Sequence, residues 1–141
     1  MKKITLALLI LGLTACSQGV TDMSDRSNAP CGDKPNCVST QDNRDKHTLA
    51  PYSLKQGVTI EQVKTAALQL SGAKLASEKD QYLHIECTSK IMRFVDDLEL
   101  KIEGEQLIVR SESRVGYSDF GVNRKRAEKL REILKDTGLL K

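Results

Sequence analysis

Aromatic side chains are scarce in this chain, and so is clustered charge of either sign. Its 141 residues include three Tyr, two Phe and no Trp, so we expect no platform of aromatic rings for stacking bases or sugars. The net charge is only +3, whereas a nucleic-acid-binding face usually needs clustered basic residues. These two scarcities argue against a nucleic acid partner.

Histidine and long apolar runs are scarce as well. His47 and His84 are the two histidines, and neither has the ligand-like spacing of a metal site. We therefore expect no metal and no cofactor. The apolar run at residues 4–13 is about half as long as the roughly 20 apolar residues needed to span a bilayer.

The first residues are typical of the cleaved signal of a bacterial lipoprotein. Lys2 and Lys3 precede the apolar run, as in secretory signal peptides. The next stretch, Leu-Thr-Ala-Cys at residues 13–16, resembles a lipobox, in which the Cys thiol is acylated before cleavage. We predict that residues 1–15 are removed and that Cys16 carries fatty acids such as palmitate. Each buried methylene contributes roughly 0.8 kcal/mol, so several acyl chains anchor a protein durably.

The predicted location is the outer membrane, facing the periplasm, in a host with two membranes. This expectation comes from Ser17, because the residue after the Cys is not Asp. In a host with one membrane the location would be the cell membrane. Residues 16–30 are predicted to be the lipidated Cys and a flexible tether, with an average reach of roughly 20 Å. Residues 31–141 are then a single domain close to the membrane.

Three cysteines remain besides the one predicted to be acylated. Exported chains meet an oxidising compartment, where Cys pairs tend to form disulfides. Cys31 and Cys37 would close the smallest loop, and we favour this pair. Cys87 lies on the apolar side of a predicted strand, where a free thiol behaves as a small hydrophobe. A pairing of Cys87 with either of the other two stays open.

The spacing of apolar residues predicts an α+β domain in the order helix, four strands, helix. A capping box at residues 59–62 begins the first helix, and Gly72 is expected to end it. The last helix is predicted from Asn123 to about Thr137. We expect a four-stranded antiparallel sheet with one apolar face covered by both helices and one solvated face. The strands are predicted around residues 73–77, 83–88, 97–102 and 107–112.

A two-residue loop at residues 104–105 fixes the register of the last hairpin. It places Glu99 opposite Arg110, and it places Asp97 opposite Glu112. Like charges that face each other directly are destabilising. Two interpretations stay open, a solvated ladder of alternating charges and a functional patch that uses the carboxylates.

Basic residues at 124–126, Arg-Lys-Arg, occupy the first turn of the last predicted helix. Cations there oppose the helix dipole, and breaking such a local rule often marks a functional site. Helix N-terminal amides together with Arg side chains favour an anion. Alternatively, the two arginines pair with Asp96, Asp119 or Glu128 and only fix the loop.

Three stretches together resemble an uncharacterised family called domain of unknown function 1499. They are residues 35–39, 94–97 and 111–124, and the resemblance covers roughly residues 31–134. It implies a signature surface but no established activity. Cys87 lies outside the family's pattern, which favours the Cys31–Cys37 disulfide. The residues that the resemblance places on the surface are Asn36, Ser39, Asp96, Asp97, Ser113, Arg114, Tyr117, Ser118, Asp119, Gly121, Asn123 and Arg124.

The leading functional hypothesis is a non-enzymatic, membrane-tethered binding or envelope-maintenance domain. Its polar surface would be centred on Arg114, Asp119 and Arg124, with a small anion or a polar envelope component as ligand. One alternative is a hydrolase-like enzyme that uses an Asp or Ser of the final motif. Another is an interaction module for an envelope protein, which would show an exposed apolar patch of several hundred Å². The predicted binding surface comprises Asp96, Asp97, Ser113, Arg114, Tyr117, Ser118, Asp119, Asn123 and Arg124.

Overall fold

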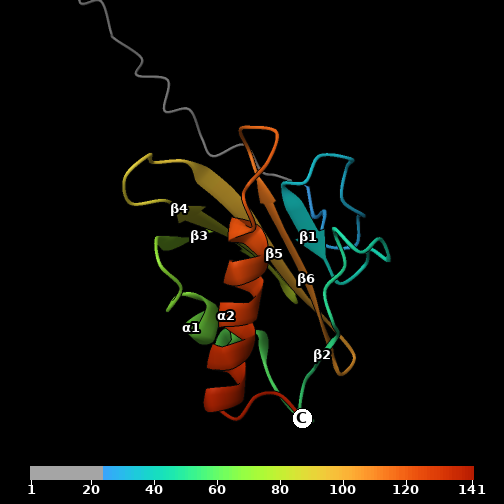
Figure 1. Ribbon diagram of the computed structural model, residues 1–141. Coiled ribbons are helices and arrows are strands. Elements are labelled where there is room, and N and C mark those ends of the chain that lie inside the picture. The colour runs from blue at the N-terminus through green and yellow to red at the C-terminus, as the bar shows by residue number, and fades with distance from the viewer. Residues whose placement is uncertain (1–23) are drawn as a thin grey trace, which may run out of the picture.

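An antiparallel sheet runs through residues 24–141, the part of the chain that the computed structural model describes (Figure 1). Its long strands follow one another as hairpins, because alternating apolar and polar residues give each strand one face for a core. The predicted α+β class is confirmed. The four long strands are β3 (Ala73–Lys79), β4 (Tyr82–Thr88), β5 (Val95–Glu103) and β6 (Gln106–Ser113).

Two short strands enlarge the sheet from the predicted four strands to six. They are β1 (Cys37–Ser39) and β2 (Tyr52–Ser53), and both pair antiparallel with β6. The order is β1-β6-β5-β4-β3, with β2 beside β6. The predicted strand number was wrong because strands of three and two residues are too short to show a period of two.

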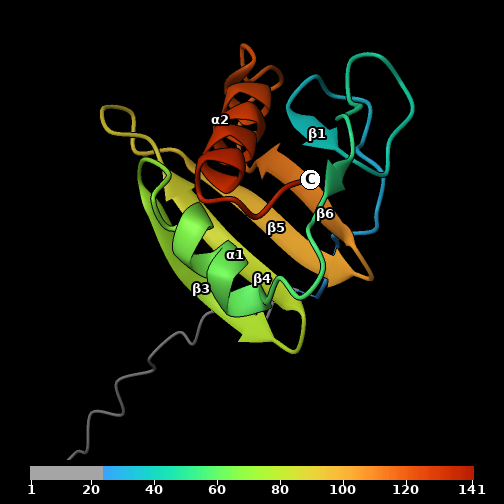
Figure 2. The same ribbon diagram turned by 90° about the horizontal axis from the view of Figure 1, so that it is seen from below.

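Helices α1 (Ile60–Ala67) and α2 (Val122–Asp136) lie on one face of the sheet (Figure 2). The predicted capping box is present, with Thr59 as the N-cap of α1. Helix α1 ends before Gly72, the predicted stop. Gly72 instead has φ 69° at the start of β3, and a Cβ there would lie 2.1 Å from the carbonyl oxygen of Thr88. A glycine is therefore required for this close approach.

The apolar faces of both helices and the sheet form the core. Val63 and Ala67 of α1 and Leu130 and Leu134 of α2 are fully buried. Within the described residues, neither helix is both long and apolar enough to cross a membrane. The predicted signal peptide and the predicted lipid anchor at Cys16 lie outside those residues.

The last hairpin has the predicted register, with Glu99 opposite Arg110 and Asp97 opposite Glu112. The face that carries these charges, here called the polar face, was predicted to be solvated, and this was wrong. Glu99 is fully buried, and Asp97 and Arg110 are each only 4% exposed. Residues 24–30, which the sequence predicts to belong to the tether, cover this face, because Arg26 and Ala29 both bond to it.

Charges on the polar face are paired with one another, as burial demands. The carboxylate of Glu99 accepts hydrogen bonds from the backbone N–H of Arg26 at 2.9 Å and from the hydroxyl of Tyr82 at 2.9 Å. Guanidinium nitrogens of Arg26 and Arg110 lie 3.3 Å and 3.4 Å from its second oxygen. Glu112 also pairs with both arginines, at 3.2 Å and 2.7 Å.

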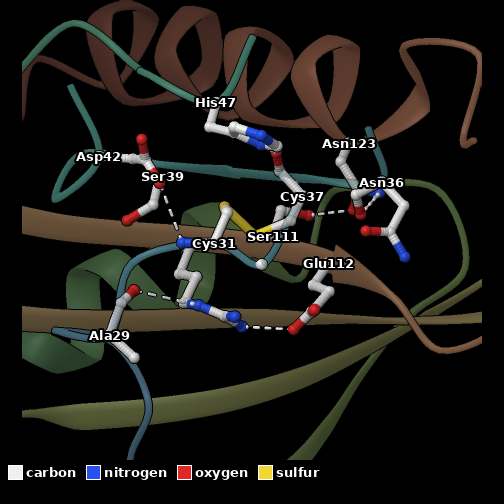
Figure 3. Close-up of a disulfide and its surroundings, with 12 residues drawn as sticks. Ala29, Cys31, Asn36, Cys37, Ser39, Asp42, His47, Ser111, Glu112 and Asn123 are labelled. Atoms are coloured by element: carbon white, nitrogen blue, oxygen red, sulfur yellow. Dashed lines mark hydrogen bonds and ion pairs between the residues drawn. A yellow bond between two sulfur atoms is a disulfide. The ribbon is translucent and has the colours of Figure 1, made fainter. Parts of the chain in front are cut away.

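The predicted disulfide joins Cys31 and Cys37 (Figure 3). It fastens the end of the covering segment to β1, beside Asp42, which accepts a hydrogen bond from the backbone N–H of Cys31 at 3.0 Å. Cys87 is free and buried. Burial raises the pKa of its thiol to about 11, so Cys87 is an uncharged part of the core. Of the alternatives left open above, the free buried thiol is the one observed.

Candidate functional site

Asn123 joins β6, the residue just before β1 and the start of α2. Its side chain is fully buried, and its amide oxygen accepts a hydrogen bond from the hydroxyl of Ser111 at 2.7 Å. Its amide nitrogen donates to the carbonyl oxygen of Asn36 at 3.1 Å (Figure 3). It also donates to the hydroxyl of Ser113 at 2.8 Å. A buried amide satisfied on both sides fixes its neighbours in one arrangement.

Arg126 extends this network to β5. One of its nitrogens donates to Asp96 at 2.7 Å, and the other donates to Ser111 at 3.2 Å and Asn123 at 2.8 Å. Asp96 stands opposite Ser113 in the sheet. The pairing of Arg126 with Asp96 agrees with the alternative in which the arginines at the start of this helix pair with nearby carboxylates and fix the loop.

Asp119 supplies the cap that α2 would otherwise lack. The N-cap residue of α2 is Gly121, with φ 83° and no side chain. One carboxylate oxygen of Asp119 accepts from the N–H of Gly121 at 2.8 Å, and the other accepts from the N–H of Asn123 at 3.1 Å. A carboxylate is favourable at a helix N-terminus, so Asp119 fixes the loop that leads into α2.

The loop between β4 and β5 and the loop between β6 and α2 lie at the same end of the domain, at the top of Figure 1. A cleft of about 690 Å³ lies between them, within the range of about 300–1,000 Å³ that is typical of ligand pockets. Its polar floor comes from Asp96 and Ser113, while most of its wall is apolar. The cleft is lined by Ser89, Phe94, Asp96, Ser113, Val115, Gly116, Tyr117, Ser118, Asp119, Phe120 and Val122.

Exposed apolar side chains gather around this cleft. Eight large apolar side chains of the described residues are exposed, and seven of them lie in residues 91–94 and 115–122. Phe120 is 90% exposed and Tyr117 is 70% exposed. Exposed apolar side chains that gather in one part of a surface often mark a binding site. Ile91 and Met92 lie in the same loop as Phe94, and the other five of the seven line the cleft: Phe94, Val115, Tyr117, Phe120 and Val122.

Five of the nine residues of the predicted binding surface line the cleft, and one lies behind it. That residue is Asn123, whose buried and hydrogen-bonded amide is described above. The other three lie outside the cleft and are described next. The five that line the cleft are Asp96, Ser113, Tyr117, Ser118 and Asp119.

Asp97 and Arg114 meet on the polar face. Nε of Arg114 donates to Asp97 at 3.0 Å, and the ring Nε2 of His84 lies 2.7 Å from the same carboxylate. Burial by itself raises the pKa of Asp97, but the bonds to His84 and Arg114 outweigh it and lower the pKa to about 2. The carboxylate therefore stays charged and paired at neutral pH.

Arg124 lies neither at the cleft nor on the polar face but bonds to the segment before β2. Its guanidinium donates to the carbonyl oxygens of Thr48 at 2.8 Å and Lys46 at 3.3 Å. Arg114, Asp119 and Arg124 are thus each bonded to different partners within the domain. The three side chains do not converge, although the sequence predicted a polar surface centred on them that would bind an anion.

Hydroxyl and imidazole groups do not meet at the cleft. His84 pairs with Asp97, and the ring Nδ1 of His47 lies 3.0 Å from the carbonyl oxygen of Cys37. The hydroxyl of Ser113 is hydrogen-bonded to Asn123. Within residues 24–141, no three His, Cys, Asp or Glu side chains are grouped to hold a metal ion.

The apolar side of the cleft was not predicted from the sequence. The stretches that resemble the family contain Phe94, Val115, Phe120 and Val122. None of these four was proposed as a site residue, although polar neighbours of each were. The missed signal is that these large apolar side chains stand in expected loops. Apolar residues in a loop are exposed unless another segment covers them, and exposure favours a binding role.

Comparison with known proteins gives one match. Residues 28–134 match the model of the family described as "Protein of unknown function (DUF1499)". No curated protein and no solved structure matches the chain. Since the match spans well over half of the 141 residues, the chain belongs to the DUF1499 family.

Proposed function

We propose that this chain is a membrane-anchored binding protein whose cleft takes the apolar part of an envelope molecule. The observation that carries the proposal is that five of the eight exposed large apolar side chains of the described residues line one cleft. Burying such side chains against a ligand contributes about 1.5–3 kcal/mol for each one fully covered. The anchor at Cys16 and the outer-membrane location are parts of this proposal.

The cleft is suited to binding because its frame is rigid. Asn123, Arg126 and Asp119 hold the loop into α2 through bonds of 2.7–3.1 Å. A ligand therefore meets a largely preformed wall, and less ordering free energy is lost on binding. Polar groups at its floor, such as Asp96, are already paired and add orientation rather than reactivity.

Binding of an uncharged fluorescent probe, N-phenyl-1-naphthylamine, tests the proposal. The chain from residue 16 onward should carry Cys16→Ser, so that its own acyl chains do not compete. We expect one saturable site per chain. The double variant Phe94→Ser/Tyr117→Ser should bind at least about tenfold more weakly, because two apolar contacts are lost.

Leu68→Ser is the matched control, because Leu68 is 40% exposed and lies in neither the cleft nor the two loops beside it. It should keep the affinity of the parent chain. Equal loss in the control, or no saturable binding at all, would overturn the proposed site. The anchor has its own test, because mass spectrometry of the natural product should show a chain that begins with an acylated Cys16.

An interaction module for another envelope protein is the second candidate, and the same exposed loops favour it. A stable protein interface buries roughly 800 Å² on each partner, more than a small probe covers. Crosslinking in cells from Phe120, which is 90% exposed, would then give one discrete protein adduct. A hydrolase is less well supported, because the Ser and His side chains described above do not converge.

A further inference from the structure

A second hollow adjoins the cleft on the side of α2. Its volume is about 320 Å³, and it shares Ser89 and Val122 with the cleft. Lys125, Arg126 and Lys129 line it. The apolar cleft thus shares an edge with a second hollow that carries three basic side chains, here called the basic hollow.

The carboxylates at this end of the domain are already bonded. Asp96 pairs with Arg126 at 2.7 Å, and Asp119 accepts hydrogen bonds from the start of α2. Lys129 pairs with Glu132 at 2.9 Å in an exposed position. Lys125 is exposed, and no carboxylate of residues 24–141 lies within ion-pair distance of it. The basic hollow therefore offers a free ammonium group to a ligand.

We infer that the ligand is an anionic phospholipid, with its acyl chains in the cleft and its phosphate at Lys125. This inference rests on the proposed function, because it names the ligand of the same cleft. A phospholipid carries a negative group directly beside apolar chains, which matches two hollows that share an edge. Lysine binds phosphate as a compact point charge, and the cleft supplies the apolar contacts.

The length of chain before the domain fits a ligand drawn from the anchoring membrane. Asp25 pairs with Lys101 at 3.0 Å, six residues along β5 from Val95, or about 20 Å from the cleft end. Eight residue steps separate Cys16 from Ser24, and an extended chain of that length spans at most about 28 Å. An acylated Cys16 can therefore reach the level of the cleft, so the cleft can face the bilayer.

Titration with short-chain lipids below their micelle concentration tests the inference on the chain with Cys16→Ser. We expect dihexanoylphosphatidylglycerol to bind at least about tenfold more tightly than zwitterionic dihexanoylphosphatidylcholine. Lys125→Glu should abolish this preference. Lys79→Glu is the matched control, because Lys79 is an exposed residue at the end of β3 and lies in neither hollow.

The outcomes distinguish a failure of the inference alone from a failure of the proposed function. Equal binding of the two lipids, with no effect of Lys125→Glu, would overturn the inference, while saturable binding of the naphthylamine probe would still support the cleft. Inorganic phosphate that binds as tightly as the anionic lipid would also overturn it, because the site would then recognise a free anion. If neither the lipids nor the probe bind, both are overturned.

Discussion

The polar face and the cleft depart in opposite ways from the usual distribution of side chains. On the polar face, charged groups such as Glu99 and Arg110 are buried, and each has partners within the domain. At the cleft, apolar groups such as Phe120 are exposed and have no cover. The buried charges thus serve the fold, whereas the uncovered apolar groups are available to a ligand.

Replacement of Glu99 by Ala should have the largest effect on stability. Arg26 and Arg110 each contact Glu99 and Glu112, and this change would remove the fully buried carboxylate of the two. Breaking a buried ion pair costs about 3–5 kcal/mol, and we expect a loss of that size in the free energy of unfolding measured in urea. Glu132→Ala, which removes an exposed pair with Lys129, should cost less than about 1 kcal/mol. Similar losses in the two variants would mean that the polar face does not stabilise the fold.

Acid should weaken the polar face through Asp97. Its pKa is lowered to about 2 in the folded chain, against about 3.9 in an unfolded chain. Its contribution is therefore complete above about pH 5 and is lost as the pH falls through about 4 to 2. The difference in unfolding free energy between the parent chain and Asp97→Asn should shrink by about 2 kcal/mol over that interval.

Asp80→Asn is the control for this pH dependence, since Asp80 is an exposed turn residue. Its difference from the parent chain, measured between pH 6 and pH 2, is the reference against which the change for Asp97→Asn is judged. A pH-independent difference for Asp97→Asn would contradict the role given to the bonds from His84 and Arg114.

The smallest effect on stability is expected at the cleft. Phe120 has φ 53°, a left-handed conformation that costs most residues about 1–2 kcal/mol but suits glycine. Phe120→Gly should therefore leave the unfolding free energy unchanged or raise it by up to about 1 kcal/mol, while it weakens binding of the naphthylamine probe. Phe94→Gly, at a position without positive φ, should lower stability. A destabilised Phe120→Gly variant would show that this side chain supports the fold.

Local features of the fold could be predicted from the sequence. The capping box at Thr59 and the register that pairs Glu99 with Arg110 depend on residues close together in the chain. The disulfide between Cys31 and Cys37 also closes a short loop. Strands β1 and β2 could not be predicted, because they are too short for a periodic pattern and depend on β6 for pairing.

The candidate site was predictable only on its polar side. Asp96, Ser113 and Asp119 lie in stretches that resemble the family, and they do line the cleft. Phe94 and Phe120 come from two loops that the sequence places 26 residues apart. Their meeting at one cleft follows from the order of the strands and the position of α2.

The sequence by itself determined where the main helices and strands begin, which face of each is apolar and which cysteines could pair. Hydrogen bonds between near neighbours and the period of the apolar residues are sufficient for that. Only the tertiary structure decided which charges are buried and which apolar residues stay exposed. The bond from Arg26 to Glu99 spans 73 residues and that from Asn123 to Asn36 spans 87, and no local pattern encodes contacts of that range.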